Sequence, residues 1–133
     1  MNQKIISNLF ILAGLSNILG ALIFSKFFTN QILMNAQPEV MGYFGLLSII
    51  LWGLAYIAVS KSYAQLPWLL AVFVIEKLLY VTVWVLWLST NSLSELYSQD
   101  VFAGIFYTIY GANDLLFGLF FSLVFVQIYR KSN

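Results

Sequence analysis

The segment Pro67–Ser89 decides the fold class of this chain, and it reads PWLLAVFVIEKLLYVTVWVLWLS. Its residues are almost all apolar, except for Glu76 and Lys77 near its centre. A helix needs about 20 residues to cross the hydrocarbon core of a bilayer, so this segment is long enough to span a membrane. A charged side chain in the middle of such a helix is unfavourable by about 2.5–3.5 kcal/mol. We therefore expect neighbouring helices to hold these two groups.

Three further apolar stretches reach a similar length, and they cover Ile5–Phe28, Val40–Ser60 and Val101–Tyr129. Hydrophobic residues make up 62% of the 133-residue chain, and charged residues make up 8%. A soluble domain has roughly 45–50% apolar and about 25% charged residues, so these few charges are too few to cover a water-facing surface. The sequence predicts an all-α, polytopic membrane protein whose single domain, residues 1–133, is an antiparallel bundle of four transmembrane helices.

The ends of the apolar stretches carry typical helix-start residues. Pro38 and Pro67 stand where the first turn of a helix tolerates proline. Ser98 or Asp100 is expected to cap the fourth helix. The connections between the stretches are short, so helices that follow one another in the chain should lie side by side and antiparallel.

The orientation in the membrane follows from the basic residues at the ends of the spans, because cytoplasmic ends carry an excess of lysine and arginine. The two termini and the middle connection share one side, which carries Lys4, Lys61, Arg130 and Lys131. The other side carries Lys26 alone. This distribution predicts a multi-pass protein of the bacterial inner membrane with the N- and C-termini in the cytoplasm.

The composition also excludes several classes of function. The chain has no cysteine and no histidine, which rules out disulfides and thiolate metal sites and removes the usual general base and haem ligand. We expect no metal and no cofactor. The net charge of +1 gives no basic surface for nucleic acid, so the expected partners are membrane lipids and a small solute.

Several polar side chains lie at depths where a lipid-facing helix would carry apolar residues. They are Asn17 in the first stretch, Glu76 and Lys77 in the third, and Asn113 and Asp114 in the fourth. Ionisable groups inside a membrane mark functional sites, and polar ones also join helices. These residues are the candidate binding residues, together with Tyr80, which lies one helical turn from the charged pair.

Lys77 is expected to pair with Asp114 and not with Glu76. Neighbours in sequence project about 100° apart on a helix, so Glu76 and Lys77 point in different directions. Asp114 lies at a matching depth in the fourth stretch. Glu76, left without its own cation, is expected to be protonated because burial disfavours the charged form. Asn17 and Asn113 are expected to form hydrogen bonds between helices.

Small residues recur at helical spacing beside these polar groups. In the fourth stretch they are Gly104, Thr108, Gly111, Gly118 and Ser122, and in the first stretch they are Gly14 and Ala21. Stripes of this kind let transmembrane helices approach closely. We interpret them as packing surfaces, which also permit a two-fold homodimer.

The chain resembles an uncharacterised family of small bacterial four-helix membrane proteins. The shared pattern consists of a Gly-x-x-Asn at Gly14–Asn17, a Gly-x-x-Tyr-x-x-Ala at Gly53–Val59 with valine in the last position, Pro67, Lys77, and the Asn-Asp pair at Asn113–Asp114. The family typically has Gly-Lys where this chain has Glu76-Lys77. More distantly, the layout is similar to DoxX-like membrane proteins, some of which are linked to quinone redox chemistry.

Three classes of function fit these residues. The first is binding or translocation of a small polar or anionic solute, in which Lys77 attracts the solute and Asp114, with Glu76, accepts a proton. The second is a non-catalytic structural or assembly subunit, in which the Lys77–Asp114 pair only fixes how the helices dock. The third is a membrane enzyme acting on a quinone-like or lipid substrate. It ranks lowest because no nucleophile–base pair is recognisable.

Overall fold

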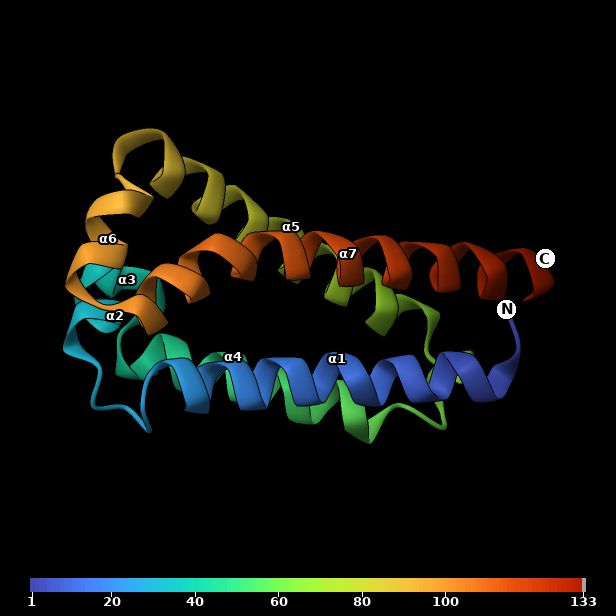
Figure 1. Ribbon diagram of the computed structural model, residues 1–133. Coiled ribbons are helices and arrows are strands. Elements are labelled where there is room, and N and C mark those ends of the chain that lie inside the picture. The colour runs from blue at the N-terminus through green and yellow to red at the C-terminus, as the bar shows by residue number, and fades with distance from the viewer. Residues whose placement is uncertain (133) are drawn as a thin grey trace.

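The computed structural model describes residues 1–132, and this part of the chain is helical and without β-strands (Figure 1). Its longer helices are α1 (Gln3–Phe24), α4 (Tyr43–Ala58), α5 (Pro67–Thr90) and α7 (Val101–Ser132). Its short elements are α2 (Gln31–Ala36), α3 (Pro38–Met41), the 3₁₀ turn η1 (Tyr63–Gln65) and α6 (Leu93–Gln99). Among the described residues, 3 helices are long and apolar enough to cross a membrane, namely α1, α5 and α7. The all-α prediction is confirmed, and these helices indicate a membrane protein.

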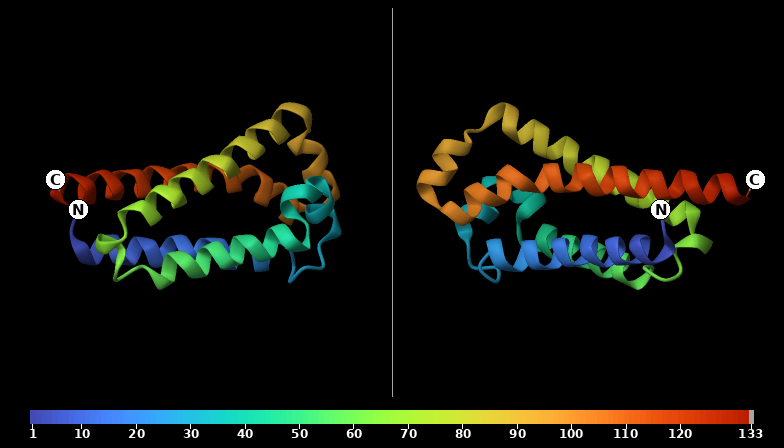
Figure 2. Two further views of the ribbon diagram at one scale, coloured as in Figure 1. Left: turned by 180° about the vertical axis from the view of Figure 1, so that it is seen from behind. Right: turned by 45° about the vertical axis from the view of Figure 1, so that its right-hand side comes forward.

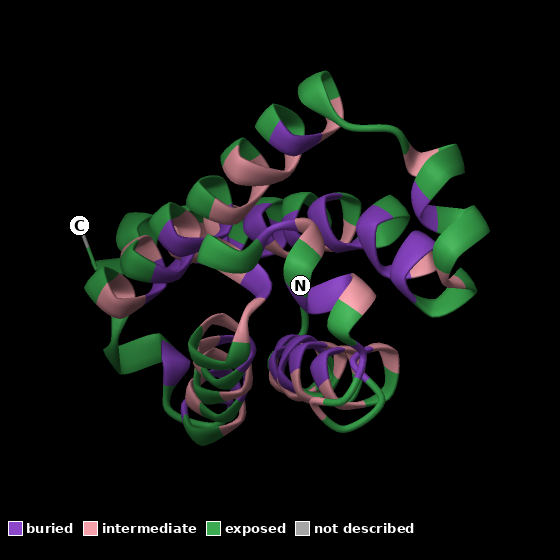
Figure 3. Ribbon diagram, turned by 90° about the vertical axis from the view of Figure 1, so that its left-hand side faces the viewer, coloured by how far each residue is buried: buried purple, intermediate pink, exposed green. Residues whose placement is uncertain are grey.

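Large apolar side chains are exposed along the outside of the longer helices. Phe44 is 84% exposed, Leu116 68% and Leu79 63%. Figure 3 shows buried and exposed residues alternating along every long helix, so that each helix has an inner and an outer face. Monomers in water rarely expose apolar surface on this scale. Lipid is the solvent that such an outer surface fits.

The longer helices form two pairs. Helix α1 packs mainly on α4, and α5 packs mainly on α7. The N- and C-termini lie at the same end of the bundle (Figures 1 and 2). At the opposite end the short helices fold in, where α2 contacts α7 and α3 contacts α4. The polar residues in the middle of the helices therefore lie between two pairs, and each pair is well packed within itself.

Glycines bring the paired helices close together. A Cβ added at Gly14 of α1 would overlap the carbonyl oxygen of Gly53 in α4, and a Cβ added at Gly53 would lie 2.7 Å from the Gly14 oxygen. On α7, a Cβ added at Gly118 would lie 3.2 Å from the Cβ of Lys77. At Gly14 and Gly118 the expected role of the small residues in close helix packing is confirmed, and Gly53 takes the same role in α4.

The second apolar stretch does not form the single helix expected over Val40–Ser60. Helix α3 begins at Pro38, as predicted, but the chain is extended at Gly42, with φ −71° and ψ −171°. Helix α4 begins only at Tyr43 and has 16 residues, fewer than the approximately 20 that cross a bilayer. The chain folds so tightly at this break that a Cβ at Gly45 would overlap the carbonyl oxygen of residue 40.

The first helix also differs from the expectation, because α1 ends at Phe24 and not at Phe28. Residues 26–28 have positive φ angles of 52°, 56° and 67°, and this left-handed conformation costs an L-residue about 1–2 kcal/mol. The turn is held by Asn30, whose Nδ2 donates to the Phe24 carbonyl at 3.0 Å and whose Oδ1 accepts from the Leu33 N–H at 3.2 Å. Asn30 thus caps the end of α1 and the start of α2 together.

Asp100 ties this turn to the start of α7. Its carboxylate accepts hydrogen bonds from Lys26 Nζ at 2.8 Å, from Asn30 Nδ2 at 2.7 Å and from the Ala103 N–H at 2.8 Å. Of the two expected capping residues, Asp100 is therefore the one that caps α7, whereas Ser98 lies within α6. Burial acts to raise the pKa of Asp100, but the three hydrogen bonds outweigh it and lower the pKa below its ordinary value of 3.8.

We expect Gly14→Ala to lower the stability of the protein. Its Cβ would overlap the Gly53 oxygen and lie 2.9 Å from Ile57 Cδ1, so the α1–α4 pair would have to separate. Thermal unfolding in mild detergent should show a Tm that is several degrees lower. Gly20→Ala on the same helix is the control, because its Cβ would meet no atom within 4 Å. Alanine also favours the helix by about 1 kcal/mol. Equal losses in the two variants would contradict this packing.

Replacing Asp100 with Asn should lower Tm at neutral pH, because the amide cannot pair with the Lys26 ammonium. Since the pKa of Asp100 is lowered on folding, its contribution is complete above the ordinary pKa and is lost as pH falls through the lowered value. The difference in Tm between wild type and Asp100→Asn should stay constant from about pH 7 to about pH 5 and shrink below about pH 4. Glu95→Gln serves as the control for loss of an exposed carboxylate. A difference that persists in acid would refute the assignment.

Candidate functional site

Lys77, in the middle of α5, is the centre of a buried polar cluster. Its Nζ lies 2.8 Å from Asp114 Oδ1 of α7 and donates a 3.3 Å hydrogen bond to Asn17 Oδ1 of α1. It also lies 5.0 Å from the centre of the Tyr56 ring of α4. The lysine is 1% exposed. The expected ion pair with Asp114 is present, and the ammonium is surrounded by groups from every long helix.

Asn17 joins α1 to α4 and to α5. Its Oδ1 accepts from Lys77, and its Nδ2 donates to the carbonyl oxygen of Ile49 in α4 at 3.0 Å. Both ends of this buried amide are therefore hydrogen-bonded, as a polar group in an apolar interior requires. The side chain can sit there because Gly14, one turn earlier, lets α1 approach α4.

Glu76 points away from Lys77, toward α4. The Tyr56 hydroxyl donates a hydrogen bond to Glu76 Oε1, while Lys77 Nζ is 4.0 Å from Oε2, which is too long for a strong hydrogen bond. Within residues 1–132, Glu76 Oε2 is the buried side-chain oxygen or nitrogen that lacks a hydrogen-bond partner. The separation of the two neighbours follows the 100° rotation expected from the sequence. One buried carboxyl oxygen is left without a hydrogen bond at the centre of the protein.

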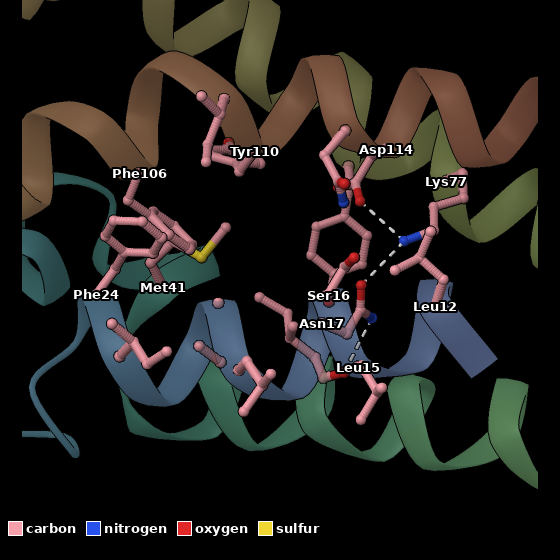
Figure 4. A pocket seen from close by; sticks show the side chains of 18 of the residues that line it. Leu12, Leu15, Ser16, Asn17, Phe24, Met41, Lys77, Phe106, Tyr110 and Asp114 are labelled. Atoms are coloured by element: carbon pink, nitrogen blue, oxygen red, sulfur yellow. Dashed lines mark hydrogen bonds and ion pairs between the residues drawn. The ribbon is translucent and has the colours of Figure 1, made fainter. Parts of the chain in front are cut away.

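A cavity of about 460 Å³ reaches this cluster from between α1 and α7 (Figure 4). All of the binding residues predicted from the sequence line it: Asn17, Glu76, Lys77, Tyr80, Asn113 and Asp114. Figure 4 shows Asn17, Lys77 and Asp114 converging at one end of the cavity. Residues from three helices that are far apart in the sequence thus share one concave site.

The predicted residues differ in how they take part in the site. Asn17, Glu76, Lys77 and Asp114 are buried; Asn17 and Asp114 bind the Lys77 ammonium directly, and Glu76 Oε2 lies 4.0 Å from it. Tyr80 and Asn113 are half-buried and line the cavity wall. The inner group holds the cluster together, and the outer two are placed to touch a molecule in the cavity.

Tyr56 belongs to the site although it was not among the predicted binding residues. It is fully buried, donates to Glu76 and faces Lys77 with its ring. The Gly-x-x-Tyr pattern at Gly53–Tyr56 is part of the family resemblance, but we did not interpret its tyrosine as a binding residue. The usable signal was Gly53, one turn earlier, because a glycine that allows close approach of α1 and α4 brings the tyrosine at i+3 to the same inner face.

The cluster is closed on the side of the termini by aromatic rings. The Tyr56 ring packs on Phe73 at 4.9 Å and on Phe121 at 5.0 Å between centroids, and Phe10 packs on Phe121 at 5.3 Å. These residues belong to a buried apolar cluster that fills this half of the bundle. The polar groups are therefore open toward the cavity and sealed from the end that carries the termini.

At its far end the cavity is bordered by a second polar contact. The Tyr110 hydroxyl, on the cavity wall, donates to the buried Gln37 Oε1 at 2.7 Å. Gln37 Nε2 in turn donates to the Val83 carbonyl of α5 at 3.0 Å. The α2–α3 segment is thereby fastened across the space between the helix pairs. This segment therefore closes the cavity at the end opposite the termini.

The Lys77→Met variant should be strongly destabilised. Removing one partner of a buried ion pair leaves the other charge uncompensated and costs about 3–5 kcal/mol. The double variant Lys77→Met/Asp114→Leu removes both charges and should regain part of this loss. Unfolding free energies of wild type, the two single variants and the double variant measure the coupling between the residues. Strictly additive losses would mean that the two side chains do not interact.

Comparison of the chain with protein-family models, curated proteins and solved structures finds no match. What the site can bind therefore follows from its own geometry and charge.

Proposed function

We propose that the protein is a four-helix, multi-pass protein of the bacterial inner membrane with both termini in the cytoplasm. Helix α4 alone is short for a span, but α3 and α4 together cover residues 38–58, close to the approximately 20 residues that a bilayer requires. An even number of crossings agrees with termini at the same end of the bundle (Figure 1). That end also carries most of the basic residues, as the cytoplasmic side should.

Within this membrane protein, the proposed function is binding of a small polar solute in the cavity between α1 and α7. The observation that carries the proposal is the convergence of all the predicted polar residues on one cavity. Tyr80 and Asn113 are half-buried on the cavity wall and offer polar groups to a solute.

The charges in the cluster favour a neutral or cationic solute over an anionic one. Lys77 and Asp114 neutralise each other at 2.8 Å, and Glu76 adds a second carboxyl group without adding a cation. The Lys77 ammonium already contacts Asp114 and Asn17 and is 1% exposed. An incoming anion would meet two carboxyl groups and an ammonium that is already engaged, so of the polar and anionic solutes expected from the sequence we favour the polar one.

Proton-coupled translocation is the extension of this function that the same residues allow. Glu76 is among the residues that line the cavity, and Tyr56 holds its Oε1; a shift of the side chain that uncovered Oε2 would let it exchange a proton with a bound solute. Passage across the membrane would further require the rings of Phe73 and Phe121 to separate, since they close the path toward the termini. Binding needs no such rearrangement and is the part of the proposal with the more direct support.

A structural or assembly role is the second candidate. Lys77 joins α5 to α7 and α1, and Asn17 joins α1 to α4. A buried network that links every long helix can serve to specify the packing of the bundle. In that case the cavity would be a packing defect filled by lipid, and no polar solute would reach the cluster.

Thiol labelling tests whether a polar solute reaches the site. The chain has no cysteine, so Ser16→Cys places a single thiol on the cavity wall, beside Asn17. In proteoliposomes it should react with 2-aminoethyl methanethiosulfonate, a small cation, faster than with the anionic 2-sulfonatoethyl reagent of similar size. Intact mass spectrometry measures both rates.

Leu79→Cys is the matched control, since Leu79 lies at a similar depth and is 63% exposed on the lipid side. It should react slowly with both reagents, because a lipid-facing thiol is not ionised. If Ser16→Cys is as unreactive as this control, solute binding is refuted and the structural role is favoured. Faster reaction with the anion would overturn the charge argument.

A further inference from the structure

We propose that the end of the bundle that carries the termini is a binding surface for phospholipids whose head group has a net negative charge. Its cationic groups are four exposed basic side chains, Lys4, Lys61, Arg130 and Lys131, and we call this surface the basic end. The proposal goes beyond solute binding, because it uses none of the residues that line the cavity.

Two contacts bring the segments of the basic end together. The Met1 nitrogen donates a hydrogen bond to Gln127 Oε1 at 3.3 Å, which places the start of α1 beside the last turns of α7, one turn before Lys131. The ring of Trp68, in the first turn of α5, packs on the ring of Tyr129 at 6.1 Å between centroids. The connection between α4 and α5 ends just before this tryptophan. Figure 2 shows these chain ends gathered at one end of the bundle.

The basic end has no acidic side chain to neutralise it. The five acidic residues of the chain lie in the polar cluster or at the opposite end, and they are Glu39, Glu76, Glu95, Asp100 and Asp114. Within residues 1–132, the ion pairs involve Lys26 and Lys77 and none of the four basic side chains. Lys26, at the opposite end, is paired with Asp100 at 2.8 Å. Counter-ions for the basic end must therefore come from outside this part of the chain.

The position of Lys4 is unfavourable for its own helix. The first turn of a helix carries a partial positive charge and favours acidic side chains, but the first turn of α1 has none. Asn2 caps this turn by accepting from the N–H groups of Lys4 and Ile5, so the backbone donors are satisfied while the lysine adds positive charge. Arg130 and Lys131, in the last turn of α7, suit the helix dipole. An external anion would remove the unfavourable interaction at Lys4.

The basic end lies at the depth of the lipid phosphates. Trp68 is 67% exposed and Tyr129 is 45% exposed, and such residues are enriched at the boundary between hydrocarbon and water. Arg130 and Lys131 follow Tyr129 directly. The head-group layer is about 5–8 Å thick on each side of the bilayer, which is about one helical turn. These cations are therefore placed among phosphate groups and not in bulk water.

The charge of the basic end selects the kind of head group. A zwitterionic head carries a phosphate but also an ammonium group, which the four cations would repel. An anionic head carries no such group, and clusters of basic residues beside a membrane span bind anionic lipids through this charge. Soluble phosphate has the same charge, but the bilayer holds lipid phosphates at this depth at a high local concentration. Anionic phospholipid is therefore the favoured partner.

The test is a competition between phosphatidylglycerol and phosphatidylcholine with the same acyl chains. The protein is equilibrated in mixed micelles that contain the two lipids in equal amounts, and the lipids that co-purify with it are quantified by mass spectrometry. The wild type should retain several-fold more phosphatidylglycerol. This excess should decrease as salt is raised, since salt screens exposed charges. Lys4→Gln/Lys61→Gln/Arg130→Gln/Lys131→Gln should retain the two lipids equally.

Thermal unfolding in nanodiscs separates loss of lipid binding from loss of the fold. A ligand that binds the folded state raises Tm, so phosphatidylglycerol should raise the Tm of the wild type by several degrees over phosphatidylcholine. The quadruple variant should lose this increase but keep the Tm of the wild type in phosphatidylcholine, because its four side chains are exposed and make no ion pair within residues 1–132.

Lys26→Gln is the matched control, because it removes a lysine from the opposite end. It should lower Tm in both lipids, through loss of the pair with Asp100, and leave the excess of phosphatidylglycerol unchanged. The proposal is refuted if the wild type retains both lipids equally or if the quadruple variant keeps the excess. It is also refuted if inorganic phosphate in phosphatidylcholine nanodiscs raises Tm as much as phosphatidylglycerol does. Labelling of Ser16→Cys involves none of these residues, so solute binding and lipid binding can fail separately.

Discussion

The structure depends on the contacts of one ammonium group in the middle of α5. Lipid offers Lys77 no hydrogen-bond partner, and burial of an unpaired charge is strongly unfavourable. Asp114 of α7 and Asn17 of α1 supply the missing partners, and Asn17 in turn binds the backbone of α4. Satisfying this single group therefore sets the relative depth of all the long helices. The cavity is placed by the same constraint, since its polar end is this cluster.

Close packing and open space are arranged on opposite sides of the polar cluster. Gly14 and Gly53 press α1 against α4, and Gly118 lets α7 meet α5 beside Lys77. Apolar clusters occupy both ends of the bundle, and the one near the termini seals the polar groups with aromatic rings. Helices α1 and α7 contact each other much less than the members of each pair do, and the space left between them is the cavity. Two tightly packed helix pairs thus leave a cavity between them.

Local pattern predicted some elements well and others poorly. Helix α5 was predicted almost to the residue, because Pro67 marks its start and a long apolar run, interrupted at Glu76-Lys77, defines its length. The end of α1 and the break at Gly42 were missed. Both lie inside apolar sequence, where hydropathy does not change, and both depend on distant partners: Asn30 and Asp100 hold the first turn. Tyr56 was overlooked as a site residue for a similar reason, since its role comes from the approach of α1 to α4.

The sequence by itself determined the helical class, the lipid-facing composition and the pairing of Lys77 with Asp114. These follow from quantities that each helix carries alone: its length, its apolar content and the depth of its charged residues. Only the tertiary structure decided that Glu76 turns to Tyr56, that one of its oxygens is buried without a hydrogen bond, and that a cavity reaches the polar cluster from between α1 and α7. These features depend on the rotation and spacing of one helix against another. Side-chain packing between the helices sets that geometry, and the sequence of a single helix does not contain it.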